Sequence, residues 1–329
     1  MTYRKLELSA SKSTVTLFTT FSGDYKNKLE VKINDTIIPV CKQPKVLGVI
    51  LDSLLTFSHH AKYVADKSRK RNQVVKALSN SSWGEDRETL KVTFKAINES
   101  VMAYAAPVWF PNLSRTRSEE IQRTQNQALR SVTGCLQMTD INDLHNEAEV
   151  LPFKEHSDML CKQFSIKCLN KSSPNFHLAE ENRPPRNIRP SFMDKYREYA
   201  QNRLEEIEEV GYSSVIKKIH TEEVKKFVTI SNHPKVLCGE PAPNVDDSEK
   251  TLPRCTRVTL AQLRAGYSSM LNSYRARISE DVENKCPNCK RSGHDTAHLF
   301  RCSEKPTSLT VESLWTSPVE VANFLGLET

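Results

Sequence analysis

The sequence has few glycines, no long apolar run and no cysteine pattern of a disulfide scaffold. Only 9 of its 329 residues are glycine, which favours helices joined by polar connections. No segment approaches the roughly 18–20 apolar residues that a membrane span requires. The N-terminal MTYRKLELSASKS lacks the apolar core of a secretory signal. The nine cysteines are odd in number and six show no framework spacing, so we expect an intracellular chain, nuclear or cytoplasmic, and no membrane partner.

Sequence motifs of common catalytic sites are also missing. There is no Gly-x4-Gly-Lys-Ser/Thr loop, no Gly-x-Gly-x-x-Gly, no Gly-x-Ser-x-Gly and no His-Glu-x-x-His. Asp246 and Asp247 are adjacent, but they lie in a Pro-containing loop and not in a strand–turn–strand setting that could hold Mg2+. The sequence therefore nominates no catalytic residue and favours a binding protein over an enzyme.

The remaining features predict an α+β fold that is mostly α. Four short, β-branched segments separated by turn residues predict a small N-terminal antiparallel sheet: 13–21, 29–34, 36–40 and 45–51. Helical periodicity takes over from about residue 58, and Leu90, Phe94, Ile97 and Val101 fall on one helix face. Trp109-Phe110-Pro111 predicts a loop, and a helix is expected after Ser114 with Ile121, Leu129 and Val132 inward. Further helices are expected over 140–149, 154–172, 192–230 and 256–278. RPPRNIRP at 183–190 is typical of a linker.

Near the C-terminus, CPNCKRSGHDTAHLFRC holds cysteine and histidine at metal-ligand spacing. Cys286 and Cys289 form a Cys-x2-Cys knuckle, and His298 and Cys302 are one helical turn apart. Together they make a Cys3His set suited to tetrahedral Zn2+. His294 competes with His298 for the fourth position, although seven residues then separate it from Cys302. Four protein ligands leave no open position for water, so the zinc is expected to be structural, with Asp295 as a candidate hydrogen-bond acceptor near the ligands.

Two other interpretations of the cysteines remain. The cluster could be accidental in a chain with nine cysteines, or the first pair could be a redox motif, which requires a βαβ setting that the sequence does not show. Four candidate ligands within seventeen residues favour the metal site.

Basic residues gather in two stretches. The net charge is +7, and the segment 254–291 contains eight Lys/Arg against three acidic residues. Its candidate nucleic-acid-binding residues, in which cations serve phosphates and aromatic rings serve stacking, are Arg264, Tyr267, Tyr274, Arg275 and Arg277. A second cluster, which also includes Lys62 and Lys76, contributes Lys67, Arg69, Lys70 and Arg71. The alternative in both stretches is a solvated helix face, with the two tyrosines in the core.

Eight stretches, in order, resemble the C-terminal half of the reverse transcriptase of non-LTR (LINE-type, jockey-like) retrotransposons. They are LSASKSTVTLFT (8–19), KVLGVILDSLLTFSHH (45–60), LKVTFKAINESVMAYAAPVWFP (90–111), IQRTQNQALRSVTG (121–134), LPF (151–153), LAQLRAGYSSMLNSYRARI (260–278), the Cys/His segment (286–302) and LWTSPVEVANFLGL (314–327). The resemblance is weakest between about 170 and 250.

The resemblance implies a role for each part. Lys12 would lie near the incoming nucleotide, and Leu47 and Gly48 would belong to the primer grip. The division expected is 1–57 for the end of the palm, 58–182 for a thumb-like helical domain, 183–253 for a linker and charged helices, and 254–329 for a basic zinc-binding module.

The same resemblance also implies what the chain would bind and what it would lack. RNA template and RNA/DNA duplex would be its partners, together with the N-terminal part of the same polyprotein. The family's Asp-Asp motif is absent, so we expect a truncated RNA-directed DNA polymerase that is inactive alone and uses Mg2+ only if a catalytic core is supplied. The alternatives are an inert, degraded reading frame and a subunit that completes a polymerase.

Overall fold

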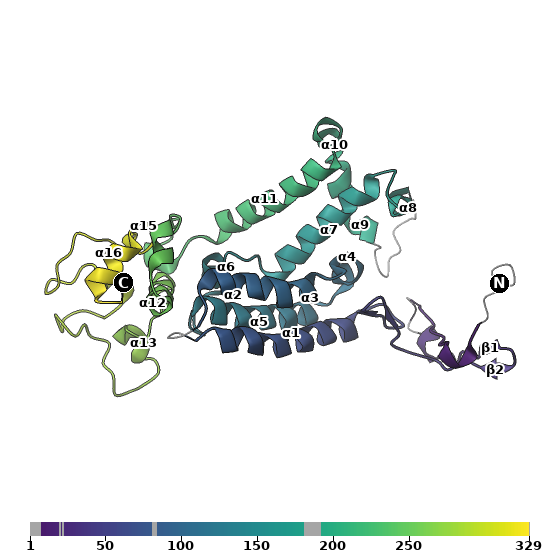
Figure 1. The fold of residues 1–329 in the computed structure, drawn as a ribbon, viewed down its shortest axis with the longest axis horizontal. Coiled ribbons are helices and arrows are strands. Elements are labelled where there is room, and N and C mark those ends of the chain that lie inside the picture. Colours follow the sequence, from purple (N-terminus) through teal and green to yellow (C-terminus); the bar gives the residue numbers. More distant parts are fainter. Residues whose placement is uncertain (1–7, 20, 22, 81–83, 181–191, 329) are drawn as a thin grey trace. The chain divides into compact units, whose positions relative to one another are not determined.

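The computed structural model describes residues 8–19, 21, 23–80, 84–180 and 192–328 (Figure 1). The fold is mostly helical with two small antiparallel sheets, which confirms the α+β class expected from the sequence. The chain forms two compact units: unit 1 (Met1–Lys67, Met102–Ile121, Phe153–His220) and unit 2 (Ser68–Val101, Gln122–Pro152, Thr221–Thr329). The four-part functional division stays a prediction, and its linker at 183–190 lies outside the described residues.

The N-terminal strands form two hairpins instead of one four-stranded sheet. Strand β1 (Lys32–Ile33) pairs with β2 (Thr36–Ile37), and β3 (Lys45–Val46) pairs with β4 (Val49–Ile50). The expected strand at 13–21 contributes one isolated bridge, Val15 to Val40. Proline supplies no ladder N–H, and Pro39 and Pro44 lie within or beside the expected strands. Short strands follow from this interruption.

Both hairpins close with two residues of positive φ. Asn34 and Asp35 have φ of 47° and 60°, and Leu47 and Gly48 have φ of 46° and 88°. Positive φ at both central residues is the geometry of a type I′ turn, which matches the twist of the strands it joins. Leu47 is unusual in this role because a branched apolar side chain disfavours that conformation.

Aromatic side chains fill the core of unit 1. Trp109 is fully buried at the end of α4 (Ala106–Trp109), where the sequence predicted a loop. Its ring stacks on that of Phe153 with 6.0 Å between centroids and meets the His60 ring edge-on at 5.2 Å. Within this unit α7 (Phe153–Leu169) packs against α4 and α9 (Phe192–Gln201). Burial of the indole explains why the segment is ordered as helix despite Pro107 and Pro111.

In unit 2 a π turn interrupts the helix that the sequence predicted as continuous. Helix α2 (Arg87–Phe94) leads into a π-helical turn (Lys95–Glu99) and then α3 (Ser100–Ala103). Leu90 and Phe94 are fully buried as expected. The buried Asn98 amide in the turn donates to the Asn72 side-chain oxygen at 2.8 Å. A buried polar pair of this kind explains the local departure from α geometry.

The predicted inward residues of α5 (Arg115–Thr133) are buried. Ile121, Leu129 and Val132 are each 0% exposed. Helix α6 (Ile141–Ala148) begins at Asp140, whose side chain accepts the Asn142 N–H at 2.9 Å. The sequence predicted a helix over 140–149, and the structure adds that Asp140 is its N-cap.

The C-terminal part of unit 2 has its own apolar core. Helices α12 (Arg254–Arg264), α15 (Ser313–Thr316) and α16 (Pro318–Leu325) lie together in Figure 1. Their core includes Leu260, Leu263, Leu314, Trp315 and Val321. The remaining helices are α1 (Ser58–Leu78), α8 (Phe176–Glu180), α10 (Leu204–Val210), α11 (Tyr212–Ser231), α13 (Asn272–Arg275) and α14 (Thr296–Leu299). Of the described helices, none has a stretch apolar and long enough to traverse a lipid bilayer.

Candidate metal centre and nucleic-acid interface

Four predicted ligands converge at the C-terminal Cys/His segment. The ligand atoms of Cys286, Cys289, His298 and Cys302 all lie within 4.8 Å of one another. The Cys286 and Cys302 sulfurs are 3.8 Å apart, and the Cys289 sulfur is 3.3 Å from His298 Nε2. Ligands about 2.0–2.3 Å from a tetrahedral zinc are about 3.5–3.8 Å apart, so the donor set and its spacing fit Zn2+.

Local backbone contacts hold the first two ligands. The knuckle after Cys286 closes when the Lys290 N–H donates to the Cys286 carbonyl at 2.9 Å and the Cys286 N–H donates to Ser292 at 2.8 Å. Lys290 has a φ of 57°, the left-handed conformation that reverses the chain here. The turn therefore brings the two cysteines together through backbone hydrogen bonds.

Of the second pair of ligands, His298 lies in the short helix α14 (Thr296–Leu299), and Cys302 lies three residues beyond the end of that helix. Asp295 caps α14 by accepting the His298 N–H at 2.8 Å. We expected Asp295 as a hydrogen-bond acceptor near the site, and this cap is the contact it makes. The cap orients the helical turn that carries His298 toward the knuckle.

Backbone N–H groups favour the thiolate at Cys289. Hydrogen bonds from the backbone of Arg291 and Ser292 lower the pKa of Cys289 to about 6. Burial instead raises the pKa of Cys286. A thiolate is the form that binds zinc, so the knuckle is partly prepared for a cation before one arrives.

His294, the rival fourth ligand, has another role. Its Nδ1 accepts the Asn272 N–H at 3.1 Å, and its carbonyl accepts the Ser273 N–H at 3.1 Å. His294 is also absent from the cluster of ligand atoms. The structure thus brings His298, not His294, to the cysteines.

Arg264, expected on a nucleic-acid-binding surface, is instead buried inside unit 2. Its side chain is 2% exposed and contacts Glu147 Oε1 and Glu249 Oε2, each at 2.6 Å. Both carboxylates are buried too, at 9% and 2% exposure. The prediction for Arg264 was wrong because it did not include Glu147, 117 positions away, or Glu249, and no phosphate can reach the guanidinium in this fold.

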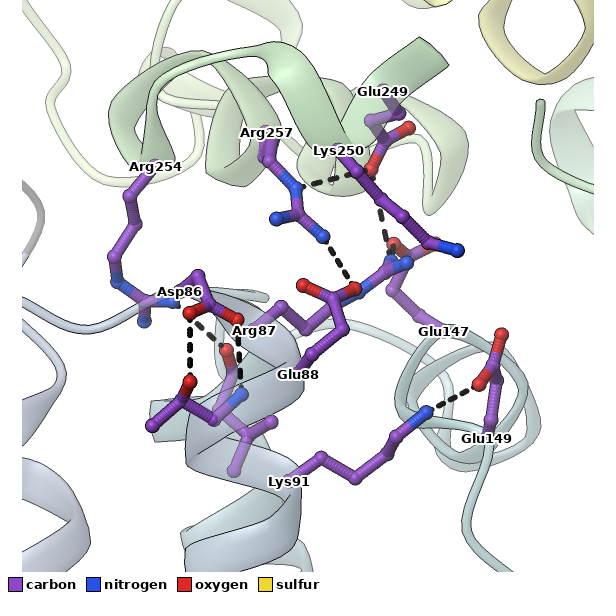
Figure 2. Close-up of polar contacts among 12 residues, drawn as sticks. Asp86, Arg87, Glu88, Lys91, Glu147, Glu149, Glu249, Lys250, Arg254 and Arg257 are labelled. Atoms are coloured by element: carbon purple, nitrogen blue, oxygen red, sulfur yellow. Dashed lines mark hydrogen bonds and ion pairs between the residues drawn. The ribbon is translucent and has the colours of Figure 1, made fainter. Parts of the chain in front are cut away.

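Arg264 belongs to an ion-pair network that we call the Arg–Glu network: Arg87, Glu88, Glu147, Glu249, Arg257 and Arg264. Figure 2 shows Arg257 directed toward Glu88 and Glu249, and Arg87 beside Glu147. The Arg257 Nη2 to Glu88 Oε1 distance is 2.6 Å. Bidentate guanidinium–carboxylate contacts of this kind are strong and directional, so the network joins α12 to α2 and α6.

The network shifts the ionisation of its members. Burial alone would raise the pKa of Glu147, but the guanidinium groups of Arg264 and Arg87 outweigh it and hold that pKa below its ordinary value. Burial opposes the charge of Arg264 as well, yet Glu147 and Glu249 raise its pKa. The charged forms therefore depend on one another.

The other predicted residues of the basic segment have mixed surroundings. Arg275 and Arg277 are exposed, and the Arg277 guanidinium lies 5.5 Å from the Tyr267 ring centroid. Tyr274 packs against the apolar core that contains Leu314 and Trp315. The two tyrosines do not share a helix face, because α12 ends at Arg264 and α13 begins at Asn272. Only the two exposed arginines are directly available to a phosphate.

The upstream candidates are mostly accessible. Lys12, Leu47, Gly48, Arg69 and Lys70 are exposed, and Lys67 is half-buried with its ammonium 5.7 Å from the Tyr63 ring.

Arg71 differs from this group because it is engaged in the fold. It donates to the Ile97 carbonyl in the π turn. Its role is at least partly structural.

Sequence reasoning missed Lys45, Tyr63 and Tyr104. Lys45 Nζ lies 4.8 Å from the Tyr63 ring centroid, and the Tyr104 hydroxyl donates to the Leu47 carbonyl at 2.7 Å. The only sequence signal was the proximity of Lys45 to the Leu47-Gly48 turn, because Tyr63 lies in α1 and Tyr104 in the turn between α3 and α4.

The comparisons with known proteins give one similarity. No protein-family model matches the chain, and no solved structure matches it. Over 150 residues the chain is 25% identical to a probable RNA-directed DNA polymerase from transposon BS of Drosophila melanogaster, covering 41% of this chain and 16% of that protein. The chain thus spans only a small part of its relative. This similarity supports a relationship to retrotransposon reverse transcriptases.

Proposed function

We propose that the chain is a nucleic-acid-binding part of a non-LTR retroelement RNA-directed DNA polymerase, comprising the end of the palm, a thumb-like helical region and a C-terminal zinc-binding module. The observation that carries the proposal is the Cys3His cluster, which has zinc-compatible distances in a segment with exposed cations. The similarity to a transposon polymerase supports the same function. Its partners would be an RNA template and an RNA/DNA duplex inside the cell.

In this function the metal is structural. Cys286, Cys289, His298 and Cys302 would hold Zn2+ and cross-link the knuckle to α14. The exposed residues around the cluster include Arg275, Arg277, Lys285, Lys290 and Arg291. Cations fixed on a folded module can neutralise phosphates and release the counterions that surround nucleic acid. The apolar core that includes Phe300 and Trp315 supports the module from within.

We further propose that the chain does not polymerise DNA by itself. Two-metal phosphoryl transfer needs carboxylates that converge on both ions. Asp246 accepts the Ser248 N–H at 2.9 Å, and Asp247 pairs with Lys250 at 2.6 Å, so both aspartates serve local contacts. Mg2+ chemistry would require carboxylates from another polypeptide. Incorporation above background in a primer-extension assay with the purified chain, Mg2+ and dNTPs would overturn this part.

The main test combines metal content with binding. Purified with zinc, the wild-type chain should carry about one zinc and bind an RNA/DNA duplex at low salt, whereas Cys286→Ser should lose the zinc and bind more weakly. Cys238→Ser is the matched control, because Cys238 is an exposed free cysteine outside the cluster. A wild-type chain without zinc would refute the metal site. A zinc-loaded chain that binds no nucleic acid would refute the binding function.

A further inference from the structure

A cavity in unit 2 is lined by a carboxylate that the fold leaves without a partner. The cavity has a volume of about 170 Å³ and lies among α6, the C-terminal end of α11, the loop that follows α11, α12 and α15. Its lining includes Asp143 and Asn146 of α6, Val228 of α11, Val245 of the loop and Trp315 of α15. We call it the Asp143 cavity.

Hydrogen bonds join the walls of the Asp143 cavity to one another. The Ser231 hydroxyl, at the end of α11, donates to Asn146 Oδ1 in α6 at 3.0 Å. The Asp246 N–H, at the end of the loop, donates to the Trp315 carbonyl in α15 at 2.8 Å. The cavity is therefore formed by elements that the fold holds together.

The Asp143 carboxylate is half-buried and has no counterion in the fold. Of the described residues, none donates a hydrogen bond to this carboxylate or lies within ion-pair distance of it. Burial, then the charges of Asp140 and Glu147, raise the pKa of Asp143 to about 6, and the charge of Lys235 offsets this only in part. A carboxylate surrounded in this way lies at negative potential, which a bound cation would stabilise.

The other charged side chains that line the cavity already have partners. Arg87 and Arg264 each pair with Glu147 at 2.6 Å. Glu149 pairs with Lys91, as Figure 2 shows. An anionic ligand would meet guanidinium groups that are already neutralised, beside a carboxylate that is not. The charges of the cavity therefore favour a cationic ligand.

The size and the apolar walls of the cavity define the rest of the ligand. A cavity of about 150 Å³ can hold benzene, so a volume of about 170 Å³ suits a compact organic molecule. Val228, Val245, Pro234 and Pro243 supply apolar surface, and Trp315 supplies an aromatic ring. A bare metal ion would instead need several oxygen ligands, which these residues do not offer.

We propose that the Asp143 cavity binds a compact organic monocation, with its ammonium or guanidinium group paired with Asp143 and its apolar body against Val228 and Trp315. The Asn232 amide nitrogen donates to the Ala242 carbonyl at 2.8 Å, so the side-chain oxygen of Asn232 can accept a hydrogen bond from the same cation. Hydrogen bonds between a cation and a carboxylate are stronger than those between neutral groups. The inference goes beyond nucleic-acid binding, because none of the exposed cations of the proposed interface lines this cavity.

The test is calorimetric titration of the zinc-loaded full chain with benzylammonium at about pH 8, where the Asp143 carboxylate is ionised. We expect about one site per chain with a dissociation constant of about 1 mM or lower. Benzyl alcohol, which has nearly the same shape and no charge, should bind at least about tenfold more weakly. No binding of benzylammonium to the wild type would overturn the proposal. Equal affinity for the two probes would show an apolar cavity without charge recognition and would also contradict it.

A charge variant locates the binding at Asp143. Asp143→Asn keeps the shape of the side chain and should weaken benzylammonium binding by about tenfold or more, with no change in benzyl alcohol binding. Its thermal melting should not fall below that of the wild type, because the substitution relieves repulsion with Asp140 and Glu147. Glu240→Gln is the matched control, because it removes an exposed carboxylate of unit 2 that does not line the cavity, and it should bind both probes as the wild type does.

A size variant tests the cavity independently of charge. Val228 is 42% exposed, so Val228→Trp should narrow the cavity from its exposed side and weaken the binding of both probes, with zinc content unchanged. Wild-type affinity for benzylammonium in Asp143→Asn would overturn the role of that carboxylate. Wild-type affinity for both probes in Val228→Trp would place the binding outside the cavity and contradict the proposal.

Discussion

Arg264 in α12 and Lys45 in β3 are both basic residues in stretches that resemble nucleic-acid-binding segments, but their surroundings differ. Arg264 is 2% exposed and has buried carboxylates at 2.6 Å on either side. Lys45 is exposed, and its ammonium lies over a tyrosine ring without an acidic partner among the described residues. The fold supplies carboxylates for the first charge and, among the described residues, none for the second. A local excess of basic residues therefore does not identify a binding surface until the carboxylates are placed.

The largest expected effect tests the buried side of this comparison. Arg264→Met should destabilise unit 2 by about 3–5 kcal/mol, because it leaves Glu147 and Glu249 buried without their partner. Chemical unfolding followed by circular dichroism measures this. Arg275→Ala is the matched control and should cost less than about 0.5 kcal/mol, since Arg275 is exposed. Equal unfolding midpoints for the two variants would show that the Arg–Glu network contributes nothing to stability.

Acid should also weaken the Arg–Glu network, but by less than Arg264→Met does. The pKa of Glu147 is lowered from its ordinary value of 4.5, so the folded chain releases this proton more readily than the unfolded chain. The resulting stability is fully present above about pH 4.5 and is lost as pH falls through the lower, folded pKa. Unfolding midpoints measured from pH 7 to pH 3 should fall steeply below about 4.5 in the wild type. Glu147→Gln should show a shallower fall in that window, and an identical pH profile would contradict the assignment.

The smallest expected effect concerns the exposed arginines Arg275 and Arg277. Arg275→Ala/Arg277→Ala should reduce RNA/DNA duplex affinity by about tenfold at low salt, or about 1.4 kcal/mol, with no change in zinc content. Fluorescence anisotropy measures the affinity, and metal analysis measures the zinc. Undiminished affinity would remove these two arginines from the interface, and zinc loss would mean that they support the module.

Features set by neighbouring residues could be predicted from the sequence. The inward face of α5, the start of α6 near Asp140 and the Cys-x2-Cys knuckle all depend on contacts within a few residues. The preference for His298 over His294 followed from helical spacing alone, and the structure brings His298 to the cysteines.

Features set by long-range contacts could not be predicted. Arg264 pairs with Glu147, which is 117 positions away, and no pattern in the neighbouring sequence predicts that pairing. The π turn at Lys95–Glu99 accompanies a contact between Asn98 and Asn72, 26 positions away. The four expected strands formed two hairpins because strand pairing depends on partners that the local pattern does not specify. Tyr63 was missed because its neighbour Lys45 lies in a separate element, the strand β3.

The central claim is that cations left unpaired by the fold bind nucleic acid. Its most direct test is the affinity of the zinc-loaded wild-type chain for an RNA/DNA duplex from about 50 to about 200 mM salt. The account predicts that log K falls linearly with log salt with a slope of about −3 or steeper, as expected for several phosphate contacts. No binding at the lowest salt, or an affinity that does not change with salt, would contradict it.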